Sequence, residues 1–210
     1  EYQRRITQPM MEFAKDKYLT TRNGIDLQIP DILPARHINR FVYTSSPNRG
    51  LLHLLHWWPD IKAKVKDAEL HIFYGFTDFW KQCERGDPSL LKVRLEVEEL
   101  RTQPGIIWRG FKSNRDLENF MLTTNLFVYP STFPEISCIS AMKAQALGCI
   151  PITSRFAALD ETVQYGVKLG ASDNPDIKEH KDEFIAQIFR YTEMDYGREE
   201  KRREMMDWAQ

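Results

Sequence analysis

The sequence predicts an α/β fold in which a parallel sheet is covered by helices on both faces. Three observations predict this fold. Short apolar runs rich in β-branched and aromatic residues recur along the chain, segments with helical spacing separate them, and glycines or prolines follow several of these runs. Strands that alternate with helices pair in parallel, because each helix carries the chain back across the sheet.

The composition is typical of one globular domain. The chain has 210 residues, of which 42% are hydrophobic and 28% are charged. Its 29 Lys and Arg residues against 30 Asp and Glu residues give a formal net charge of −1. This balance argues against a general nucleic-acid binder, which usually carries a strong basic excess, but it leaves room for a local basic pocket that binds one phosphate group.

Membrane, disulfide and metal classes find no support in the sequence. No apolar run approaches the ~20 residues that span a bilayer, and residues 1–5 do not resemble a signal peptide. The odd number of cysteines, Cys83, Cys138 and Cys149, has no metal-ligand spacing and indicates reduced thiols in a cytoplasmic protein. The five histidines form no cluster such as HxxxH, so no zinc site is predicted.

The first 39 residues are expected to precede the sheet. Residues 1–15 can form a helix broken at Pro9, residues 17–21 are β-like, and a turn follows at Asn23-Gly24. Residues 27–39 contain two prolines and little periodicity, which suits a linker. Because the chain begins with Glu and stops inside a helical pattern, we interpret it as a fragment of a longer protein, with a mature processed protein as the alternative.

The first half of the alternation begins at residue 40. Strands are expected where β-branched and aromatic residues run together, and helices where apolar residues recur every three or four positions. Pro59 should kink or divide the first helix, and Gly75 closes the second strand. In chain order the expected elements are a strand at 40–44, a helix at 50–66, a strand at 69–74, a helix at 88–102 and a strand at 106–108.

The second half repeats the pattern. Asn114 is a plausible N-cap, Pro130 ends a strand, and Gly148 suits the residue after a helix. The expected elements are a helix at 114–123, a strand at 126–129, a helix at 137–147, strands at 149–153 and 167–169, and charged helices at 176–191 and 196–209.

Two conspicuous features have ordinary explanations. The charged run at residues 199–204 is expected to be a solvated helix face. A set of aromatic residues is expected to belong to the core or to a domain interface rather than to a stacking surface: Trp57, Trp58, Phe73, Tyr74, Phe76, Phe79 and Trp80.

Candidate functional residues lie after the strands, because parallel sheets bind ligands at the carboxyl ends of their strands. The segment at residues 45–50 lies between a strand and a helix, where backbone N–H groups attract phosphate and Arg49 adds a bidentate donor. Gly50 lets a ligand approach the backbone. A plain strand-to-helix turn with a surface arginine is the alternative.

A second candidate loop covers residues 130–139. The N–H groups of Ser137, Cys138 and Ile139 can bind a phosphate oxygen or a sugar hydroxyl at the start of a helix. Glu135 offers a carboxylate that accepts hydrogen bonds from sugar hydroxyls. The alternative is that Glu135 only stabilises the helix N-terminus through the helix dipole.

Several segments, in the same order, resemble the donor-binding half of the GT-B glycosyltransferases of family 4. The similarity extends over about residues 17–170, and each piece is weak alone while order and spacing together are specific. The matching segments are Asn23-Gly24-Ile25-Asp26, Arg49-Gly50, Ile107-Trp108-Arg109-Gly110-Phe111, residues 127–131 with Glu135, residues 144–151 and residues 158–163.

The resemblance implies a role for individual residues. Glu135 would contact the donor sugar, and Arg49 would stabilise the diphosphate, which becomes the leaving group. Arg109 and Gly110 lie in the strand and loop that would hold the nucleotide base. The remaining candidates for binding the nucleotide sugar are Ser45, Ser46, Gly50, Gly75, Ser137, Cys138, Ile139 and Lys143.

The chain departs from the family pattern at two places. Lys143 stands where the family has a second Glu that holds the ribose, and Lys cannot accept hydrogen bonds. The family usually has another Arg about five residues before Arg49, where this chain has Thr44, Ser45 and Ser46. Lys143 can supply part of that missing positive charge.

The resemblance also implies the domain organisation and the activity. Residues 1–22 would be a remnant of a preceding domain and the hinge, residues 23–39 the linker, and residues 40–210 a Rossmann-like donor-binding domain. The parent protein would transfer a sugar from a UDP-, GDP- or ADP-sugar to an acceptor hydroxyl with retention of configuration. The acceptor, a glycan, lipid or protein, would bind the missing N-terminal domain, so this chain alone would bind the donor without efficient transfer.

No cofactor, metal or nucleic acid is implied. The chain has no Asp-x-Asp triplet, and GT-B enzymes generally need no metal at the diphosphate, where positive side chains and helix dipoles take over. The expected location is the cytoplasm, and association of the full-length protein with a membrane surface stays open.

Two other classes of function stay open. The chain can be a non-catalytic module that binds nucleotide sugars, with Lys143 marking the lost activity, or it can be a sugar-nucleotide epimerase on the same fold. A dinucleotide-dependent oxidoreductase is disfavoured, because no GxGxxG follows a predicted strand.

Overall fold

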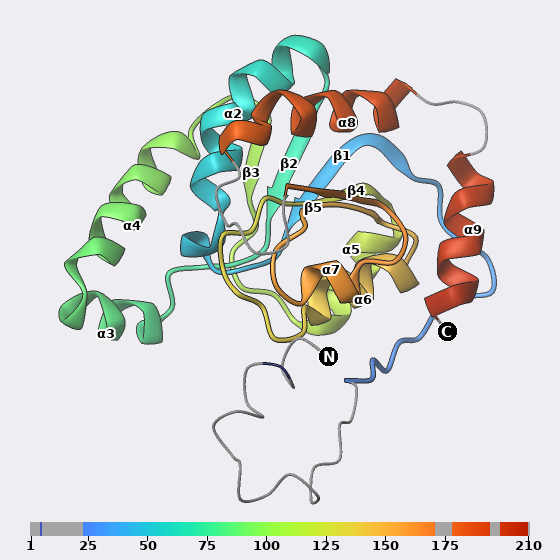
Figure 1. Cartoon of the computed structure of the whole chain (residues 1–210), viewed down its shortest axis with the longest axis horizontal. Helices are drawn as coiled ribbons and strands as arrows, with labels where there is room; N and C mark the ends of the chain where they lie inside the picture. Colours follow the sequence, from blue (N-terminus) through green and yellow to red (C-terminus); the bar gives the residue numbers. More distant parts are fainter. Residues whose placement is uncertain (1–4, 6–22, 171–177, 194–197, 210) are drawn as a thin grey trace, which may run out of the picture.

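A computed structural model describes residue 5 and residues 23–170, 178–193 and 198–209, and it contains one six-stranded parallel sheet (Figure 1). The strand order is β3-β2-β1-β4-β5-β6, with the first strand in the middle. This is the doubly wound, Rossmann-like order, so the predicted fold class is confirmed. Apart from residue 5, the segments predicted over residues 1–15 and 17–21 lie outside the described residues.

All six predicted strands are present. Phe41 in β1 lies beside Leu70 in β2 and Leu126 in β4, and all three side chains are buried. The first strand begins three residues earlier than predicted, because the N–H of His37 donates to the carbonyl of Thr123 at 2.9 Å. The strands are β1 (His37–Tyr43), β2 (Glu69–Ile72), β3 (Ile106–Trp108), β4 (Thr124–Tyr129), β5 (Ile150–Ser154) and β6 (Val167–Leu169).

Helices cover both faces because the chain crosses the sheet in two directions. The connections from β1 to β3 run one way and those from β3 to β6 run the other, so right-handed crossovers place their helices on opposite faces. Figure 1 shows α2 (Leu51–Lys64) beside α8 (Lys181–Glu193), with α4 (Pro88–Leu100) next to α2. On the other side lie α5 (Asn114–Leu122), α6 (Ile139–Ala146), α7 (Leu159–Thr162) and α9 (Arg198–Ala209), which packs on α6.

Three short helical segments were not predicted, at Pro47–Arg49, Asp78–Gly86 and Leu159–Thr162, whereas residues 178–180 fall within the helix expected at 176–191. The 3-10 turns η2 (Pro47–Arg49) and η3 (Lys178–His180) precede α2 and α8. The helix α3 (Asp78–Gly86) begins after Thr77, whose hydroxyl accepts a hydrogen bond from the N–H of Trp80 at 3.3 Å. The threonine cap was visible in the sequence, but the aromatic cluster around it masked the helical pattern.

Pro59 was expected to kink or divide α2, and the helix is not divided there. A proline inside a helix lacks the N–H that would bond to the carbonyl four residues earlier, which here belongs to Leu55. The side-chain amide of Gln103 donates to that carbonyl at 3.0 Å and replaces the missing partner. A residue 48 positions away in the sequence thus preserves the helix.

The ends of two further helices differ from the prediction. The N-cap of α5 is Ser113 rather than Asn114, because the Ser113 hydroxyl accepts from the N–H of Asp116 at 3.1 Å. The helix α6 begins at Ile139, two residues later than expected, and ends just before Gly148, which has a φ of +70°.

Most of the predicted core aromatics are buried, but the closing helix is not wholly solvated. Trp57, Trp58, Phe73 and Trp80 are buried, and Tyr74 and Phe76 are half-buried. Arg202 in α9 has an exposed fraction of only 1%, because its guanidinium reaches Asn125 at the start of β4. The prediction of a solvated face is therefore wrong at Arg202, although its neighbours Glu199, Glu200, Lys201, Arg203 and Glu204 are exposed.

None of the helices in the described ranges combines the length and the apolar character that crossing a membrane would require.

Candidate functional site

The loops that follow β1 and β4 meet at the carboxyl ends of these two central strands. Gly50 has a φ of +109°, and a Cβ atom built on it would lie 2.0 Å from the carbonyl oxygen of Pro130. No other residue fits this contact, because a side chain would be strained by the backbone conformation and would overlap Pro130. Gly50 therefore sets how closely the two predicted ligand loops approach each other.

Glu135 is the centre of this meeting point. Its carboxylate oxygen Oε1 accepts a hydrogen bond from the Tyr129 hydroxyl at 2.6 Å and from Nη1 of Arg49 at 3.2 Å. The Ser45 hydroxyl lies 3.1 Å from the Tyr129 hydroxyl. The structure thus brings together Ser45, Arg49 and Glu135 as predicted, and it adds Tyr129, which sequence analysis placed in a strand without a role.

Backbone contacts fix Glu135 in its loop. Its N–H donates to the carbonyl of Phe133 at 2.8 Å, and its carbonyl accepts from the N–H of Ala158 at 3.0 Å. Ala158 follows Ala157, which holds a left-handed φ of +55°. The loop after β5 therefore supports the loop after β4, and Glu135 is buried with an exposed fraction of 8%.

Arg49 is placed by a ring as well as by a carboxylate. Its guanidinium carbon lies 3.8 Å from the centroid of the Phe133 ring, a close cation–π contact. About a third of the Arg49 side chain stays exposed, at 34%. Arg49 therefore has a defined position and keeps N–H donors accessible to a ligand.

The groups around Glu135 hold their protons. Burial, and then the charge of Glu135 among other groups, raises the pKa of Tyr129, so this hydroxyl serves as a hydrogen-bond donor to the carboxylate. Burial followed by Glu135 also raises the pKa of the Cys138 thiol to about 12. Cys138 is thus a neutral thiol beneath the start of α6 and not an activated nucleophile.

The other candidates near these loops have separate partners. The carbonyl of Ser46 accepts from the Tyr43 hydroxyl at 2.8 Å, and the Ser46 hydroxyl donates to the side-chain oxygen of Asn48 at 2.7 Å. Ser137 is half-buried, and Ile139 is 46% exposed at the first turn of α6. Ile139 is the first residue of α6 and Cys138 its N-cap, whereas Ser137 lies one residue before the cap, outside the helix start that was predicted at 137.

Lys143 joins a different group. Its Nζ donates to Oε1 of Glu118 in α5 at 2.6 Å, and the exposed fractions of the two side chains are 13% and 18%. The two residues line a cavity of about 610 Å³ together with residues of the 23–39 segment and of α5. Glu118 was missed in the sequence, where it is one charged residue among many in a predicted helix.

Arg109, Gly75 and Gly110 lie at a third place, on the loops after β2 and β3. Nε of Arg109 donates to Nδ1 of His71 at 3.0 Å. Burial, offset in part by the hydrogen bond that His71 donates to Glu69 and reinforced by Arg109, lowers the pKa of His71 to about 4, so the neutral imidazole accepts from Arg109 at Nδ1. Gly75 lies against the backbone of Phe111, next to Gly110.

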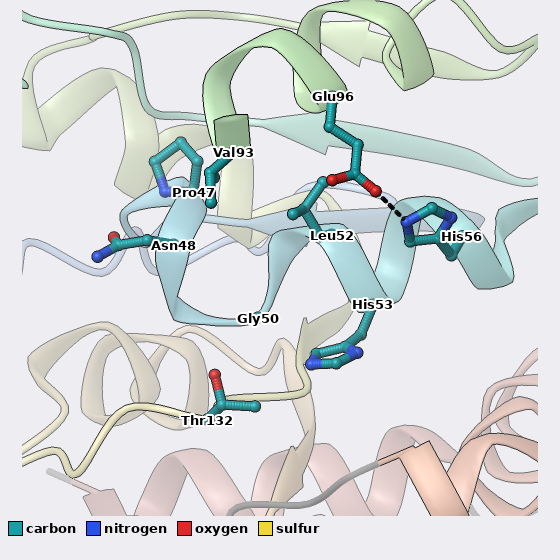
Figure 2. Close-up of a pocket in the computed structure, with 9 residues that line it drawn as sticks. All are labelled: Pro47, Asn48, Gly50, Leu52, His53, His56, Val93, Glu96 and Thr132. Atoms are coloured by element: carbon teal, nitrogen blue, oxygen red, sulfur yellow. Dashed lines mark hydrogen bonds and ion pairs between the residues drawn. The ribbon is translucent and has the colours of Figure 1, made fainter. Parts of the chain in front are cut away.

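A smaller cavity, of about 270 Å³, lies on the far side of Gly50 (Figure 2). Pro47 and Asn48 on η2 and His53 on α2 line it, and Thr132 lines it from the loop after β4. His56 on α2 and Glu96 on α4 are 2.7 Å apart at its edge and link the two helices. Sequence analysis did not predict this cavity, because the helix at 88–102 showed only a polar pattern.

A search for metal ligands, confined to the residues with described positions, finds no group of three or more His, Cys, Asp or Glu side chains that could hold an ion.

Comparison with known proteins identifies the family of the chain. The family model of the glycosyl transferases group 1 matches residues 36–201. No curated protein matches the sequence.

Solved structures share the fold at low sequence identity. A point mutant of Staphylococcus aureus TarM, crystallised with fondaparinux, α-GlcNAc-glycerol and UDP, matches with a TM-score of 0.61 and 13% identity over 90% of this chain and 35% of its own. The pneumococcal O-GlcNAc transferase GtfA, in complex with UDP and GlcNAc, matches with a TM-score of 0.60 and 15% identity over 98% of this chain and 40% of its own.

A third structure, described as trehalose-6-phosphate from Escherichia coli bound with UDP-2-fluoro glucose, matches with a TM-score of 0.60 and 14% identity over 81% of this chain and 39% of its own. At these identities the similarity concerns the fold. This chain spans between 35% and 40% of the length of the three solved proteins.

Proposed function

Because the chain belongs to the glycosyl transferases group 1, we propose that it is the donor-binding domain of a GT-B glycosyltransferase of family 4. The observation that carries the proposal is the group formed by Arg49, Tyr129 and Glu135, where an accessible cation and a buried carboxylate meet at the carboxyl ends of β1 and β4. Ligands bind at this edge in doubly wound folds, where the strand order reverses.

Arg49 is the diphosphate-binding group of the proposed site. Its guanidinium adjoins the start of α2 and keeps accessible donors, which match the oxygens of a phosphate in geometry and charge. Transfer of a sugar leaves negative charge on the departing diphosphate, and a fixed cation stabilises that charge as it develops. The exposed first turn of α6 adds backbone N–H donors and the positive end of a helix dipole.

Glu135 is the sugar-binding group. A buried carboxylate accepts strong hydrogen bonds from sugar hydroxyls, and Tyr129 and Arg49 hold it in one position. The bond between the anomeric carbon and the diphosphate breaks, an acceptor hydroxyl forms the new bond with retention of configuration, and the proton of that hydroxyl passes to the departing diphosphate. The protein's contribution is positioning and leaving-group stabilisation, without a metal.

The acceptor is expected to come from elsewhere in the full-length protein. The chain spans 35% to 40% of the three similar structures, which supports a second domain preceding residue 23. We expect residues 23–39 to connect the domains and the 210-residue chain to bind the donor without efficient transfer.

The test is a titration of the chain with UDP, GDP, ADP and CDP in the presence of a chelator, with the melting temperature as the readout. One diphosphate should stabilise the protein, because a ligand that binds only the native state adds about 2.7 kcal/mol at a hundredfold excess over its dissociation constant. The corresponding nucleotide sugars are then titrated against the wild type and Glu135→Gln.

Glu135→Gln should weaken binding of the nucleotide sugar about tenfold and leave binding of the diphosphate nearly unchanged, since Glu135 is assigned to the sugar. Glu193→Gln, an exposed change on α8, is the matched control. Failure of all four diphosphates to bind would contradict the proposed function. An equal loss for the sugar and the diphosphate would contradict the role of Glu135.

A further inference from the structure

The pair of Glu118 and Lys143 stands apart from the Arg49–Glu135 pair. It joins α5 to α6 across 25 positions of sequence, with Nζ and Oε1 only 2.6 Å apart. Both side chains are largely buried, at 18% and 13% exposure, yet both line the cavity of about 610 Å³. A buried ion pair at the wall of a cavity differs from a surface pair, because its charges already lack most of their water.

The cavity has the size and polarity of a small-molecule site. Such sites measure about 300–1,000 Å³ and place a few polar groups among their walls. Asn114 and Asn119 from α5, and Asp26 and Gln28 from the 23–39 segment, add polar residues to the lining. The cavity beside Gly50 is less than half as large, at about 270 Å³.

Glu118 is a carboxylate acceptor in the wall of this cavity, which Asp26 also lines. Within the described part of the chain, Lys143 is the one hydrogen-bond donor to its carboxylate, and it engages Oε1. A carboxylate has about four acceptor positions, so Glu118 retains capacity for further donors, whereas Lys143 has none for accepting. The groups best suited to a fixed carboxylate are two adjacent hydroxyls, each of which donates one hydrogen bond.

We propose that Glu118 binds the ribose diol of the donor nucleotide and that Lys143 is its positioning residue. This inference rests on the proposed function. Lys143 fixes Glu118 across the α5–α6 groove and neutralises a carboxylate that would otherwise repel the diphosphate through a weakly screened interior. The acceptor for the ribose is thus supplied by α5, and the lysine on α6 keeps it in place.

The experiment compares ribose and dideoxyribose ligands. The diphosphate that binds the wild-type chain and its 2′,3′-dideoxy analogue are titrated by calorimetry against the wild type and Glu118→Gln. Glu118→Gln should weaken the ribonucleotide about tenfold, the effect of losing one charge-assisted hydrogen bond, and should leave the dideoxy analogue unchanged. Asp182→Asn, on α8, is the control and should change neither affinity.

Variants of Lys143 test the positioning role. Lys143→Arg should keep the preference for the ribonucleotide over the dideoxy analogue, and Lys143→Met should reduce it. Lys143→Glu should weaken ribonucleotide binding, because two facing carboxylates repel each other. Stronger binding by Lys143→Glu would overturn the inference, since the acceptor would then belong on α6.

The failure of this inference can be told apart from the failure of the proposed function. Binding of a diphosphate without a change in Glu118→Gln, or with an equal loss for both ligands, overturns the diol contact alone. Absence of binding by every diphosphate overturns both.

Discussion

The two ends of the parallel strands hold arginines in different surroundings. At the amino ends, Arg36 donates to backbone carbonyls, and Arg202 donates to the amide oxygen of Asn125 and to the carboxylate of Glu199. At the carboxyl ends, Arg49 and Arg109 contact a carboxylate and an imidazole and remain partly accessible. The arginines at the amino ends connect segments that pack together there, whereas those at the carboxyl ends lie on the loops that carry the proposed ligand site.

Arg36 shows the structural case. Its guanidinium donates to the carbonyl of Leu147 at 2.7 Å, of Thr124 at 3.1 Å and of Met121 at 3.4 Å. Burial, and then repulsion from Arg202, lowers its pKa to about 10, which still leaves the group charged at neutral pH. The segment predicted to be a linker is therefore tied into the amino end of the sheet at its last turn before β1.

Arg202 completes that end. It donates to the side-chain oxygen of Asn125, whose amide donates in turn to the carbonyls of Ile38 at 2.5 Å and Tyr191 at 3.3 Å. One asparagine thus connects β1, β4, α8 and α9. A ligand cannot compete with these partners, because removing any of them would leave a buried polar group unpaired.

The largest effect is expected at the amino end. Arg36→Met should lower the free energy of unfolding by about 4 kcal/mol, because it removes the guanidinium that donates to three carbonyls, at a cost of about 1–3 kcal/mol for each buried group left unpaired. Denaturant unfolding measures the loss. Nucleotide affinity, measured under conditions where the variant is folded, should stay unchanged, and a selective loss of affinity would show that the two ends do not have separate roles.

The next largest effect is a dependence of folding stability on pH, which separates the carboxyl end of the sheet from the amino end. The pKa of His71 is lowered to about 4 in the folded protein from 6.5, so its neutral form is fully favoured above pH 6.5 and its stabilisation is lost as the pH falls towards 4. The loss should reach up to about 3 kcal/mol. His71→Gln should flatten the pH dependence of stability over this range, while carbonyl partners at the amino end add none. An unchanged pH profile in His71→Gln would contradict this assignment.

Arg49→Met should affect binding more than stability. Loss of a charge-assisted contact to a diphosphate corresponds to a decrease in affinity of about tenfold to a hundredfold. Calorimetric titration of the diphosphate measures it, with Arg190→Met on α8 as a control for removing an exposed arginine. If Arg49→Met destabilised the protein as strongly as Arg36→Met and bound the diphosphate normally, Arg49 would belong with the structural arginines.

The smallest effect is expected for Tyr129→Phe. The variant removes one hydrogen bond to Glu135 and keeps the one from Arg49, so the free energy of unfolding should fall by about 1.5 kcal/mol. The affinity for the nucleotide sugar should fall more than that for the diphosphate, because Tyr129 positions the proposed sugar-binding carboxylate. Thermal unfolding and paired titrations measure both quantities.

Much of the fold could be predicted because its signals are local. β3 and β6 occupy the predicted residues, and the helix that ends before Gly148 was recognised from one glycine. Errors arose where a distant residue decided the outcome. Pro59 was expected to interrupt α2, but Gln103 replaces the lost hydrogen bond, and no pattern near Pro59 reveals this partner.

The candidate site could be predicted in part. Arg49 and Glu135 were identified because they follow strands, and they do lie together. Lys143 was grouped with them, but it pairs with Glu118 on α5. Packing decides which neighbouring element a helix side chain meets, and the sequence around Lys143 does not show it. His71 was not predicted as a site residue, because a histidine inside a short apolar strand resembles any core residue.

The sequence by itself determined the alternation of strands and helices, the edge of the sheet that carries the candidate loops, and the family to which the chain belongs. These features follow from the spacing of apolar residues and from turn residues, which act within a few positions. Only the tertiary structure decided the partners: Arg49 with Glu135 across 86 positions, Lys143 with Glu118 across 25, and Arg36 with Leu147 across 111. The physical reason is that buried charges must be paired wherever packing brings polar groups together, and that packing depends on the whole chain at once.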